Sequence, residues 1–333
     1  MLTPSNGRVR TLPPYDEILS LAVRAPSIYN TQPWWWLVGE HSLDLVEDRS
    51  RRLVHADPDD RNLVLSCGAA LHHLQVAATG LGWDTVVRRL PDHTEPGKLA
   101  SIVLRESRTT SRAAARRLHT LTVRQTDRRR FTKASAATDA LARLARSGAQ
   151  WGAQVLAITQ QPVITELLLA NTRADVVQRS DEGYLRELAA WTRFRRGEGL
   201  RPESVPRQRP PTEPASSNQR FPDGLLDEAV LTNEQARASA LLLVSSSSDD
   251  SLSRLRAGET MSEVWLRAAQ AGLSVVPLSQ CIEVAETRQQ IIETLLDDRT
   301  FPQILLQVGY LPSGRAPLPR SPRRSVGDVI VRA

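Results

Sequence analysis

The chain has 333 residues, of which 41% are apolar and 24% are charged, as in an ordinary globular protein with a sizeable core. Lysine and arginine outnumber the acidic residues by 43 to 37, which gives a net charge of +6 and a pI near 10.0. This composition excludes a largely disordered chain, and no apolar run approaches the length needed to cross a bilayer.

Positive charge is carried almost wholly by arginine, the side chain best suited to bidentate recognition of phosphate and carboxylate. The arginines are spread along the sequence without a basic stripe interleaved with aromatic residues, so we expect neither nucleic acid nor a membrane as a partner. The N-terminus lacks the apolar region of a secretory signal, and Cys67 and Cys281 lack metal-ligand spacing. We therefore expect a cytoplasmic protein without a disulfide framework or a metal site.

The first predicted helix, residues 15–25, ends at Pro26, whose ring cannot extend the helical hydrogen bonds. Residues 27–32 carry hydroxyl and amide side chains, and the bulky apolar run 34–38 that follows predicts a strand. These neutral donors and acceptors are suited to reading the edge of a flat heterocycle. The alternative is a tight turn whose amides bond their own backbone, and the residues leave both interpretations open.

A long buried helix is the next strong signal. The sequence Asp57-Pro58-Asp59-Asp60 predicts a helix start with Asp57 as the cap, and apolar residues recur at helical spacing from 63 to 81, until Gly80 and Gly82 end the pattern. Around this helix we expect a hairpin turn at 39–42 and strands at 43–45, 86–87 and 102–104.

A second unit begins near Arg112. We expect helices at 112–123 and 140–146, the latter stopped by Gly148, and a strand at 154–159. Later elements are a strand at 240–244, a helix at 250–272, a strand at 274–276, a helix at 285–297 and a strand at 304–309.

Two of these long helices match at a constant offset of 190 residues. Gly68, Leu74, Val76, Ala78, Gly82 and Val86 correspond to Gly258, Val264, Leu266, Ala268, Gly272 and Val276. The matched positions run along the full length of both helices, and each helix is followed by a Val-Val strand. This correspondence predicts an internal duplication. The alternative is that two core helices of similar length simply look alike.

Residues 194–224 are rich in arginine, proline, glutamate and serine and nearly free of aliphatic residues. A segment of this length without its own periodicity is usually disordered or a lid over a functional site. The sequence leaves both interpretations open.

Motifs of self-sufficient catalysis are absent: there is no G-x-G-x-x-G after a strand, no P-loop and no H-E-x-x-H. His72 and His73 are neighbours on a helix and point about 100° apart, so we assign them to packing or the surface. An enzyme of this composition needs a cofactor that supplies the reactive atom.

Two arginine clusters are candidates for holding such a cofactor by a phosphate group. Arg124, Thr126 and Arg128 are spaced at i, i+2 and i+4, which directs alternate side chains toward one anion. Arg320, Arg323 and Arg324 form the second cluster. The alternative is a solvated run of charge, and the spacing does not decide between the two.

The segment A-P-S-x-x-N-x-Q-P-W at residues 25–34 resembles the flavin-binding loop of the nitroreductase family. With Cys67-Gly68 and the tail Ser321-Pro322-Arg323-Arg324, the chain resembles the single-chain Acg-type subgroup over nearly its whole length. The resemblance implies an α+β nitroreductase-like fold, in which two pseudo-symmetric halves combine central antiparallel or mixed sheets with long helices. It also implies FMN as the cofactor.

The resemblance assigns roles to residues of both halves. Arg124, Thr126, Arg128, Arg323 and Arg324 would hold the FMN phosphate, with Arg320 nearby. Pro26, Ser27, Ile28 and Asn30 would line the ring, and the backbone of Pro277, Leu278 and Ser279 would approach its reactive N5 edge. Flavin N5 carries the hydride in this family, so no catalytic side chain is expected.

The halves would be residues 1–111 and 112–333, with 194–224 inserted in the second as a loop or lid. Neither half repeats the motif of the other: residues 8–11 lack the order R-x-[ST]-x-R, and no A-P-S-x-x-N precedes Trp151. We therefore expect one FMN per chain and a pseudo-dimer within one polypeptide, which allows a monomer.

Three functions follow in order of preference. The first is an FMN-dependent oxidoreductase that takes electrons from NAD(P)H and reduces nitroaromatic or quinone-like acceptors. The second is a protein that stores or sequesters FMN without turnover, because the 194–224 segment covers the flavin. A nucleic-acid-binding module is third and leaves the loop at 25–34 unexplained.

Overall fold

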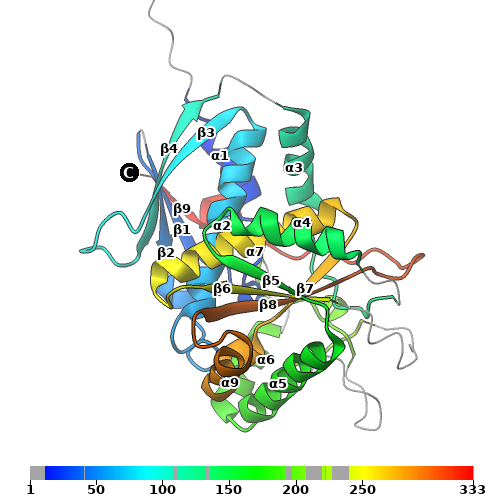
Figure 1. Ribbon diagram of the computed structural model, residues 1–333. Coiled ribbons are helices and arrows are strands. Elements are labelled where there is room, and N and C mark those ends of the chain that lie inside the picture. The colour runs from blue at the N-terminus through cyan, green and yellow to red at the C-terminus, as the bar shows by residue number, and fades with distance from the viewer. Residues whose placement is uncertain are drawn as a thin grey trace, which may run out of the picture.

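The computed structural model describes residues 12–40, 42–107, 111–132, 136–192, 197–207, 220–221, 223–226 and 240–332. Two β-sheets and the helices between and around them make up this part of the chain (Figure 1). The predicted α+β class is confirmed. Within the described residues, no helix is both long and apolar enough to cross a membrane.

The first sheet has the strand order β3–β4–β2–β1–β9. Its first four strands pair antiparallel, whereas the C-terminal β9 joins β1 in parallel, with Trp36 opposite Ile330. The sheet is therefore mixed. Its strands are β1 (Trp34–Val38), β2 (Leu43–Glu47), β3 (Trp83–Arg89), β4 (Lys98–Glu106) and β9 (Ile330–Arg332).

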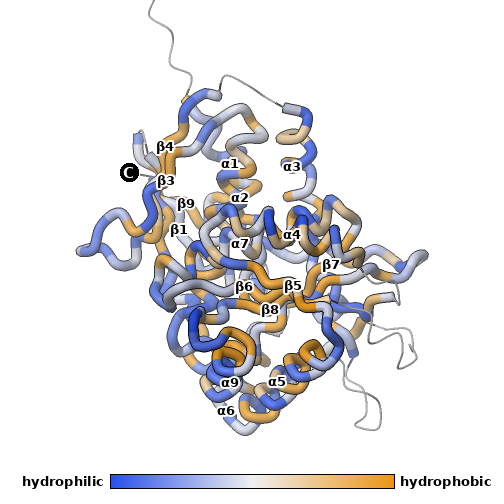
Figure 2. The backbone as a smooth tube through the Cα atoms, viewed as in Figure 1, coloured by the Kyte–Doolittle hydropathy of each residue, from blue (hydrophilic) through white to orange (hydrophobic). Residues whose placement is uncertain are grey.

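The second sheet repeats the order of those first four strands as β7–β8–β6–β5, and all its pairs are antiparallel. Every residue of β6 is buried, and Figure 2 shows apolar stretches concentrated in β5, β6 and β8. The outer edge of β5 carries no counterpart of β9 among the described strands. The strands are β5 (Gln154–Ile158), β6 (Ala240–Ser246), β7 (Ser274–Leu278) and β8 (Phe301–Gly309).

Long helices separate the two sheets in Figure 1, and α5, α6 and α9 lie beyond the second sheet at the bottom of the view. The helices are α1 (Tyr15–Ala22), α2 (Arg61–Gly80), α3 (Arg112–Val123), α4 (Thr138–Ala149), α5 (Gln161–Arg179), α6 (Glu182–Thr192), α7 (Ser251–Gln270), α8 (Gln280–Glu283) and α9 (Ala285–Leu295). The main hydrophobic core gathers on α2 and α7.

Helices α2 and α7 cross in reciprocal contact at two glycines. A Cβ on Gly68 would lie 2.0 Å from the carbonyl oxygen of Leu255, and a Cβ on Gly258 would lie 2.0 Å from that of Leu65. Both pairs obey the offset of 190 residues noted in the sequence (258 minus 68, 255 minus 65). Such self-complementary contact is typical of a two-fold relation between equal units. The matched strand orders agree with it, and an internal duplication remains our interpretation.

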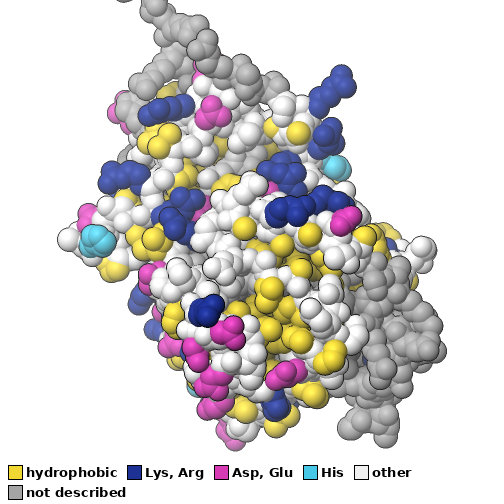
Figure 3. Space-filling model, in the orientation of Figure 1, with side chains coloured by type: hydrophobic (Ala, Val, Ile, Leu, Met, Phe, Trp, Pro, Cys, Tyr) yellow, Lys and Arg dark blue, Asp and Glu magenta, His cyan; other side chains and the backbone are white. Residues whose placement is uncertain are grey.

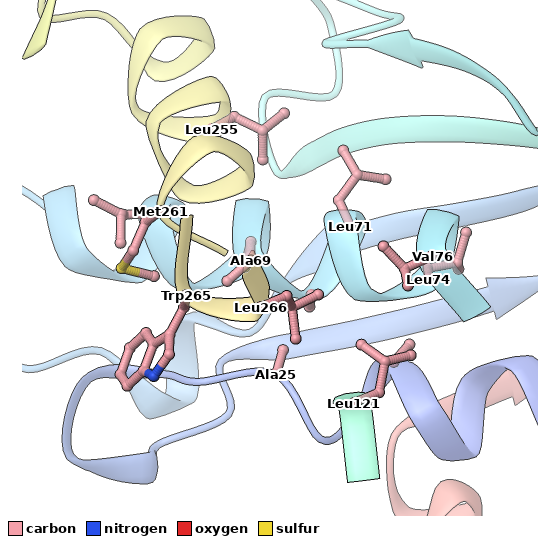
Figure 4. Packing of buried hydrophobic residues seen from close by; sticks show 14 of the residues in the cluster. Ala25, Ala69, Leu71, Leu74, Val76, Leu121, Leu255, Met261, Trp265 and Leu266 are labelled. Carbon is pink, nitrogen blue, oxygen red and sulfur yellow. The ribbon is translucent and has the colours of Figure 1, made fainter. Parts of the chain in front are cut away.

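Side chains of both helices interlock around this crossing (Figure 4). Leu255 and Leu266 of α7 lie among the side chains of Ala69 and Leu71 of α2, all of them buried. Met261 and Trp265 point together to one side of α7, away from this contact. That side faces the pocket described below.

Most predicted elements are confirmed, and α3 has the bounds that were expected. The helix start at Asp57 needs correction, because α2 begins at Arg61. Asp57 nevertheless caps it, since its carboxylate accepts hydrogen bonds from the backbone N–H groups of Asn62 (3.0 Å) and Leu63 (2.9 Å).

Gly148 does not stop α4, which runs on to Ala149. A Cβ at Gly148 would lie 2.6 Å from a methyl carbon of Val264 on α7. The glycine therefore allows α4 to pack closely on α7. Helices α5 and α6 were not predicted.

The described parts of the 194–224 region form a packed layer. Residues 197–207 pair through the backbone with residues 223–226, as in the bond from the N–H of Leu226 to the carbonyl of Val205 (2.9 Å). We call residues 197–207, 220–221 and 223–226 the covering segments. A third hydrophobic cluster holds them on the rest of the protein and contains Tyr29, Leu53, Ala56, Tyr184, Leu188, Leu200, Val205 and Phe221. This packing favours the lid over disorder for the described residues.

Candidate functional site

One large pocket is bounded by α2, α7, the end of β7 and the covering segments. It contains about 1070 Å³ of space between protein atoms, counted out to its mouth. Eleven of the thirteen residues predicted from the sequence line it: Pro26, Ser27, Ile28, Asn30, Arg124, Thr126, Arg128, Pro277, Leu278, Ser279 and Arg323.

The polar loop after α1 enters the pocket in an unusual backbone conformation. Tyr29, Asn30 and Gln32 have φ values of 46°, 58° and 52°, in the left-handed region that non-glycine residues rarely adopt. The hydroxyl of Ser27 helps to hold this shape by accepting a hydrogen bond from the backbone N–H of Gln32 (2.9 Å). Several residues in this region within one short loop are typical of functional sites.

The amides of this loop are engaged within the protein. Asn30 donates from Nδ2 to the carbonyl oxygens of Gly199 and Pro322, each at 3.0 Å, and its Oδ1 accepts from Arg323 (2.9 Å). Gln32 likewise donates to the carbonyl of Gly197 (2.8 Å). The loop therefore ties the covering segments to the C-terminal tail. The tight-turn interpretation has the amides bond their own loop, whereas Asn30 bonds the backbone of remote segments. Gln32 also makes a contact within the loop, from Nε2 to the carbonyl oxygen of Asn30 (3.3 Å). Asn30 lines the pocket.

Arg124 and Arg323 are brought together although they lie far apart in the sequence. Each donates from Nη2 to the carbonyl oxygen of Arg24, at 3.2 Å and 3.1 Å. Among the described residues neither guanidinium forms an ion pair, and Nε of both groups is buried without a hydrogen-bond partner. The indole of Trp265 lies 4.8 Å from the guanidinium carbon of Arg124.

Burial lowers the pKa of Arg124 to about 10 and that of Arg323 to about 9. The positive charge of Arg24 adds to the lowering in both, and Arg124 adds to it for Arg323. Both groups stay protonated at neutral pH. Two neighbouring cations shielded from water and without a carboxylate form a site that favours an anion.

Arg128 and Thr126 line another part of the same pocket. The guanidinium carbon of Arg128 lies 5.2 Å from the ring centre of Phe221 in the covering segments. Burial lowers the pKa of Arg128 to about 10, and the charge of Arg220 adds to this effect. A third cation therefore lines the pocket, next to the covering segments.

Two predicted phosphate ligands lie outside the pocket. Arg324 reaches toward Asp48 (3.5 Å) and stacks over the ring of Trp35 (4.8 Å). Arg320 is exposed. The tail therefore brings Arg323 alone of its three arginines to the pocket.

Several lining residues were missed by sequence reasoning. Tyr29, Met261 and Trp265 supply aromatic and apolar walls, and Asn62 and Ser66 reach the pocket from α2. Helical spacing identified α2 and α7 but did not reveal which of their faces borders a cavity. The others are Leu65, Gly199, Leu200, Arg201, Ser204, Arg220, Phe221, Gln280, Ile304, Ser321 and Pro322.

Basic side chains also lie on the surface outside this pocket. Figure 3 shows lysine and arginine spread over the visible face and interspersed with acidic side chains. Among the described residues no cluster of histidine, cysteine and carboxylate side chains is arranged to hold a metal ion. Of the two roles expected for His72, packing or the surface, the structure shows packing, because the side chain is buried. Its Nδ1 forms a hydrogen bond with Ser262 Oγ at 2.7 Å.

No family model matches the sequence. Over 320 residues the chain is 36% identical to "Putative NAD(P)H nitroreductase Rv3131" of Mycobacterium tuberculosis, covering 94% of this chain and 90% of that protein. It is 30% identical over 325 residues to "Putative NAD(P)H nitroreductase acg" of the same organism, covering 95% of each. A solved nitroreductase with bound FMN from Bacteroides fragilis is 14% identical, with a TM-score of 0.41, covering 62% of this chain and 93% of that one.

Proposed function

This chain belongs to the nitroreductase family, and we propose that it is an FMN-dependent oxidoreductase whose large pocket holds one FMN per chain. The observation that carries the proposal is the pair of neighbouring guanidinium groups, Arg124 and Arg323, without a carboxylate among the described residues. A phosphate monoester supplies the negative charge and the acceptor oxygens that these groups lack.

The other walls of the pocket are suited to a planar ring. Tyr29, Trp265 and Phe221 supply aromatic surface, and Leu278 and Ile304 supply aliphatic surface. Residues Pro26 to Ile28 of the loop and Pro277 to Ser279 at the end of β7 complete the lining. The residues therefore fit FMN at both its charged and its flat end.

Bound FMN would supply hydride transfer at N5, taking electrons from NAD(P)H and passing them to a nitroaromatic or quinone-like acceptor. The chain's own residues then have three tasks. Arg124 and Arg323 hold the phosphate, the aromatic walls orient the ring, and the covering segments exclude water. No nucleophilic side chain is required for these tasks.

The two halves also give a reason for one flavin rather than two. By the offset of 190 residues, Arg89 is the counterpart of Ser279, which lines the pocket. Arg89 donates from Nε and Nη2 to the two carboxylate oxygens of Glu259, each at 2.7 Å. Glu259 is fully buried and also accepts from Gln75, the counterpart of Trp265. We infer that this ion pair fills the counterpart of the pocket.

The test uses purified protein and added FMN. We expect a yellow protein that releases one FMN per chain on denaturation and that oxidises NADPH when a nitroaromatic compound is present. A protein that neither carries nor binds FMN would refute the proposal.

FMN storage without turnover is the second candidate, favoured by the covering segments at the mouth of the pocket. In that case the protein binds FMN as tightly, but mixing with NADPH and a nitroaromatic gives no steady-state oxidation. The two candidates thus share the FMN-binding result and differ in this second measurement.

A further inference from the structure

Arg220 forms several hydrogen bonds that link the covering segments to the rest of the protein. It is buried and forms a two-pronged ion pair with Glu283 of α8, from Nη2 to Oε2 at 2.5 Å and from Nη1 to Oε1 at 3.3 Å. Its Nε donates to the hydroxyl of Tyr184 (2.8 Å), and Nη1 also reaches Ser279 Oγ (3.2 Å). One residue therefore fixes the covering segments to α6, α8 and the end of β7.

Glu283, the carboxylate partner of Arg220, is held in position by further hydrogen bonds. Its carboxylate also accepts from Gln178 Nε2 (2.7 Å) and from Asn62 Nδ2 (3.3 Å), and its side chain is 1% exposed. The face of the Arg220 guanidinium lies 4.7 Å from the ring centre of Tyr29, in the loop after α1. Bidentate pairing, burial and stacking together favour a well-fixed guanidinium.

Phe221 follows directly and occupies the wall of the pocket. Its ring meets that of Tyr29 edge-on, with centres 5.9 Å apart, and faces the guanidinium of Arg128 at 5.2 Å. Because Arg220 is fixed on one side, the Phe221 ring is held between the polar loop and the Arg124 to Arg128 segment. The Phe221 ring therefore forms part of the pocket wall on the side of the covering segments.

We propose that Arg220 and Phe221 form a latch that discriminates electron acceptors by size, slowing the entry of aromatic acceptors while leaving small molecules such as dioxygen unhindered. The proposal rests on the proposed FMN site, since it concerns access to that pocket. Arg220 is a positioning residue in this account, and Phe221 is the barrier. The remaining contacts of the covering segments with the loop, such as Asn30 with the carbonyl of Gly199, leave the segments attached when the latch is removed.

The first test uses the ligand-free protein and needs no flavin. In Arg220→Ala, backbone hydrogen exchange of the covering segments (197–207, 220–221 and 223–226) should accelerate about tenfold or more, whereas β6 should not change. Arg186→Ala, which removes an exposed arginine of α6 paired only with Glu182 among the described residues, is the matched control. Equal protection of the covering segments in Arg220→Ala and wild type would refute the latch.

The second test measures size selection in the FMN-loaded protein. Flavin reduced by dithionite is mixed with dioxygen or with a nitroaromatic compound, and reoxidation is followed by absorbance. In Phe221→Ala, which keeps the Arg220–Glu283 pair, the rate with the nitroaromatic should rise about tenfold or more while the rate with dioxygen changes less than about twofold. Equal acceleration by both acceptors, or by neither, would overturn the size selection.

The two tests separate the failure of each proposal. If the wild-type protein does not bind FMN, the proposed function fails and with it the size selection, while the exchange measurement still decides whether Arg220 holds the covering segments. Should Arg220→Ala fold poorly, Arg220→Lys keeps the charge but not the two-pronged geometry and should show the same direction of change in exchange.

Discussion

Arg124 and Arg323 donate to one backbone carbonyl oxygen, that of Arg24, at 3.2 Å and 3.1 Å. One residue comes from the segment after α3 and the other from the C-terminal tail. Two distant parts of the chain therefore each contribute a guanidinium group to the same site. Because like charges at this separation repel, the arrangement is expected to be stabilised by a bound anion.

The arginine pair should discriminate FMN from riboflavin, which lacks the phosphate. Arg124→Ala or Arg323→Ala should weaken FMN binding by about 1.5–3 kcal/mol, as expected for a charge-assisted hydrogen bond. Riboflavin affinity should change little. Quenching of flavin fluorescence measures both. Arg324→Ala is the matched control, because Arg324 is directed at Asp48 and Trp35. Equal losses for both flavins would contradict a phosphate site.

Inorganic anions should stabilise the ligand-free protein through the same pair. At equal ionic strength, phosphate should raise the melting temperature more than chloride does, because only the native state assembles the two guanidinium groups. The difference should disappear in Arg323→Ala. Differential scanning fluorimetry over a phosphate titration measures it, and an identical response of variant and wild type would argue against the site.

The helix crossing should tolerate no side chain at either glycine. Gly68→Ala and Gly258→Ala each place a Cβ 2.0 Å from a carbonyl oxygen of the other helix, and overpacking of this kind costs about 1–3 kcal/mol or more. Because the contacts are reciprocal, the two losses should be similar in urea unfolding. Gly327→Ala, with no atom closer than 3.8 Å to the added Cβ, is the control.

Asp57 should make stability fall as the pH rises. Burial raises the pKa of this carboxyl to about 6, above its value of about 3.9 in an unfolded chain. Below about pH 4 both states are protonated and no cost arises, whereas above pH 6 the native state carries the full cost, on the order of 3 kcal/mol. Asp57→Asn should therefore gain stability relative to wild type between pH 4 and pH 6 in urea unfolding. A constant difference across this range would contradict the assignment.

The sequence predicted an element correctly where its apolar pattern and its capping or stop residues indicated the same bounds. Helix α3 has an amphipathic pattern and a Ser111 cap that accepts from the N–H of Ala114, so its bounds could be read from the sequence. Helix α5 lacks such agreement, because Leu169 and Val176 are exposed among its apolar residues and Gln160 provides no side-chain cap. Gly148 looked like a helix stop because its packing partner, Val264, is remote in the sequence.

The residues of the candidate site likewise divide into those that the sequence predicted and those that it did not. Residues of compact motifs, such as Ser27 and Arg128, were identified from short spacings, and the structure places them in one pocket. Arg220 and Phe221 lie in a segment without periodicity, so no sequence signal marked them. Their position depends on Glu283 and Tyr29, which lie on other elements. The direction of Arg324 likewise depends on Asp48 and could not be predicted from the tail alone.

The amount of FMN bound per chain tests the central claim most directly. Ligand-free protein is incubated with excess FMN, freed of unbound flavin and denatured, and the released FMN is measured by absorbance against the protein concentration. One FMN per chain is the predicted result, falling well below one in Arg323→Ala after the same washing. No retained FMN in the wild type, or two per chain, would contradict the account.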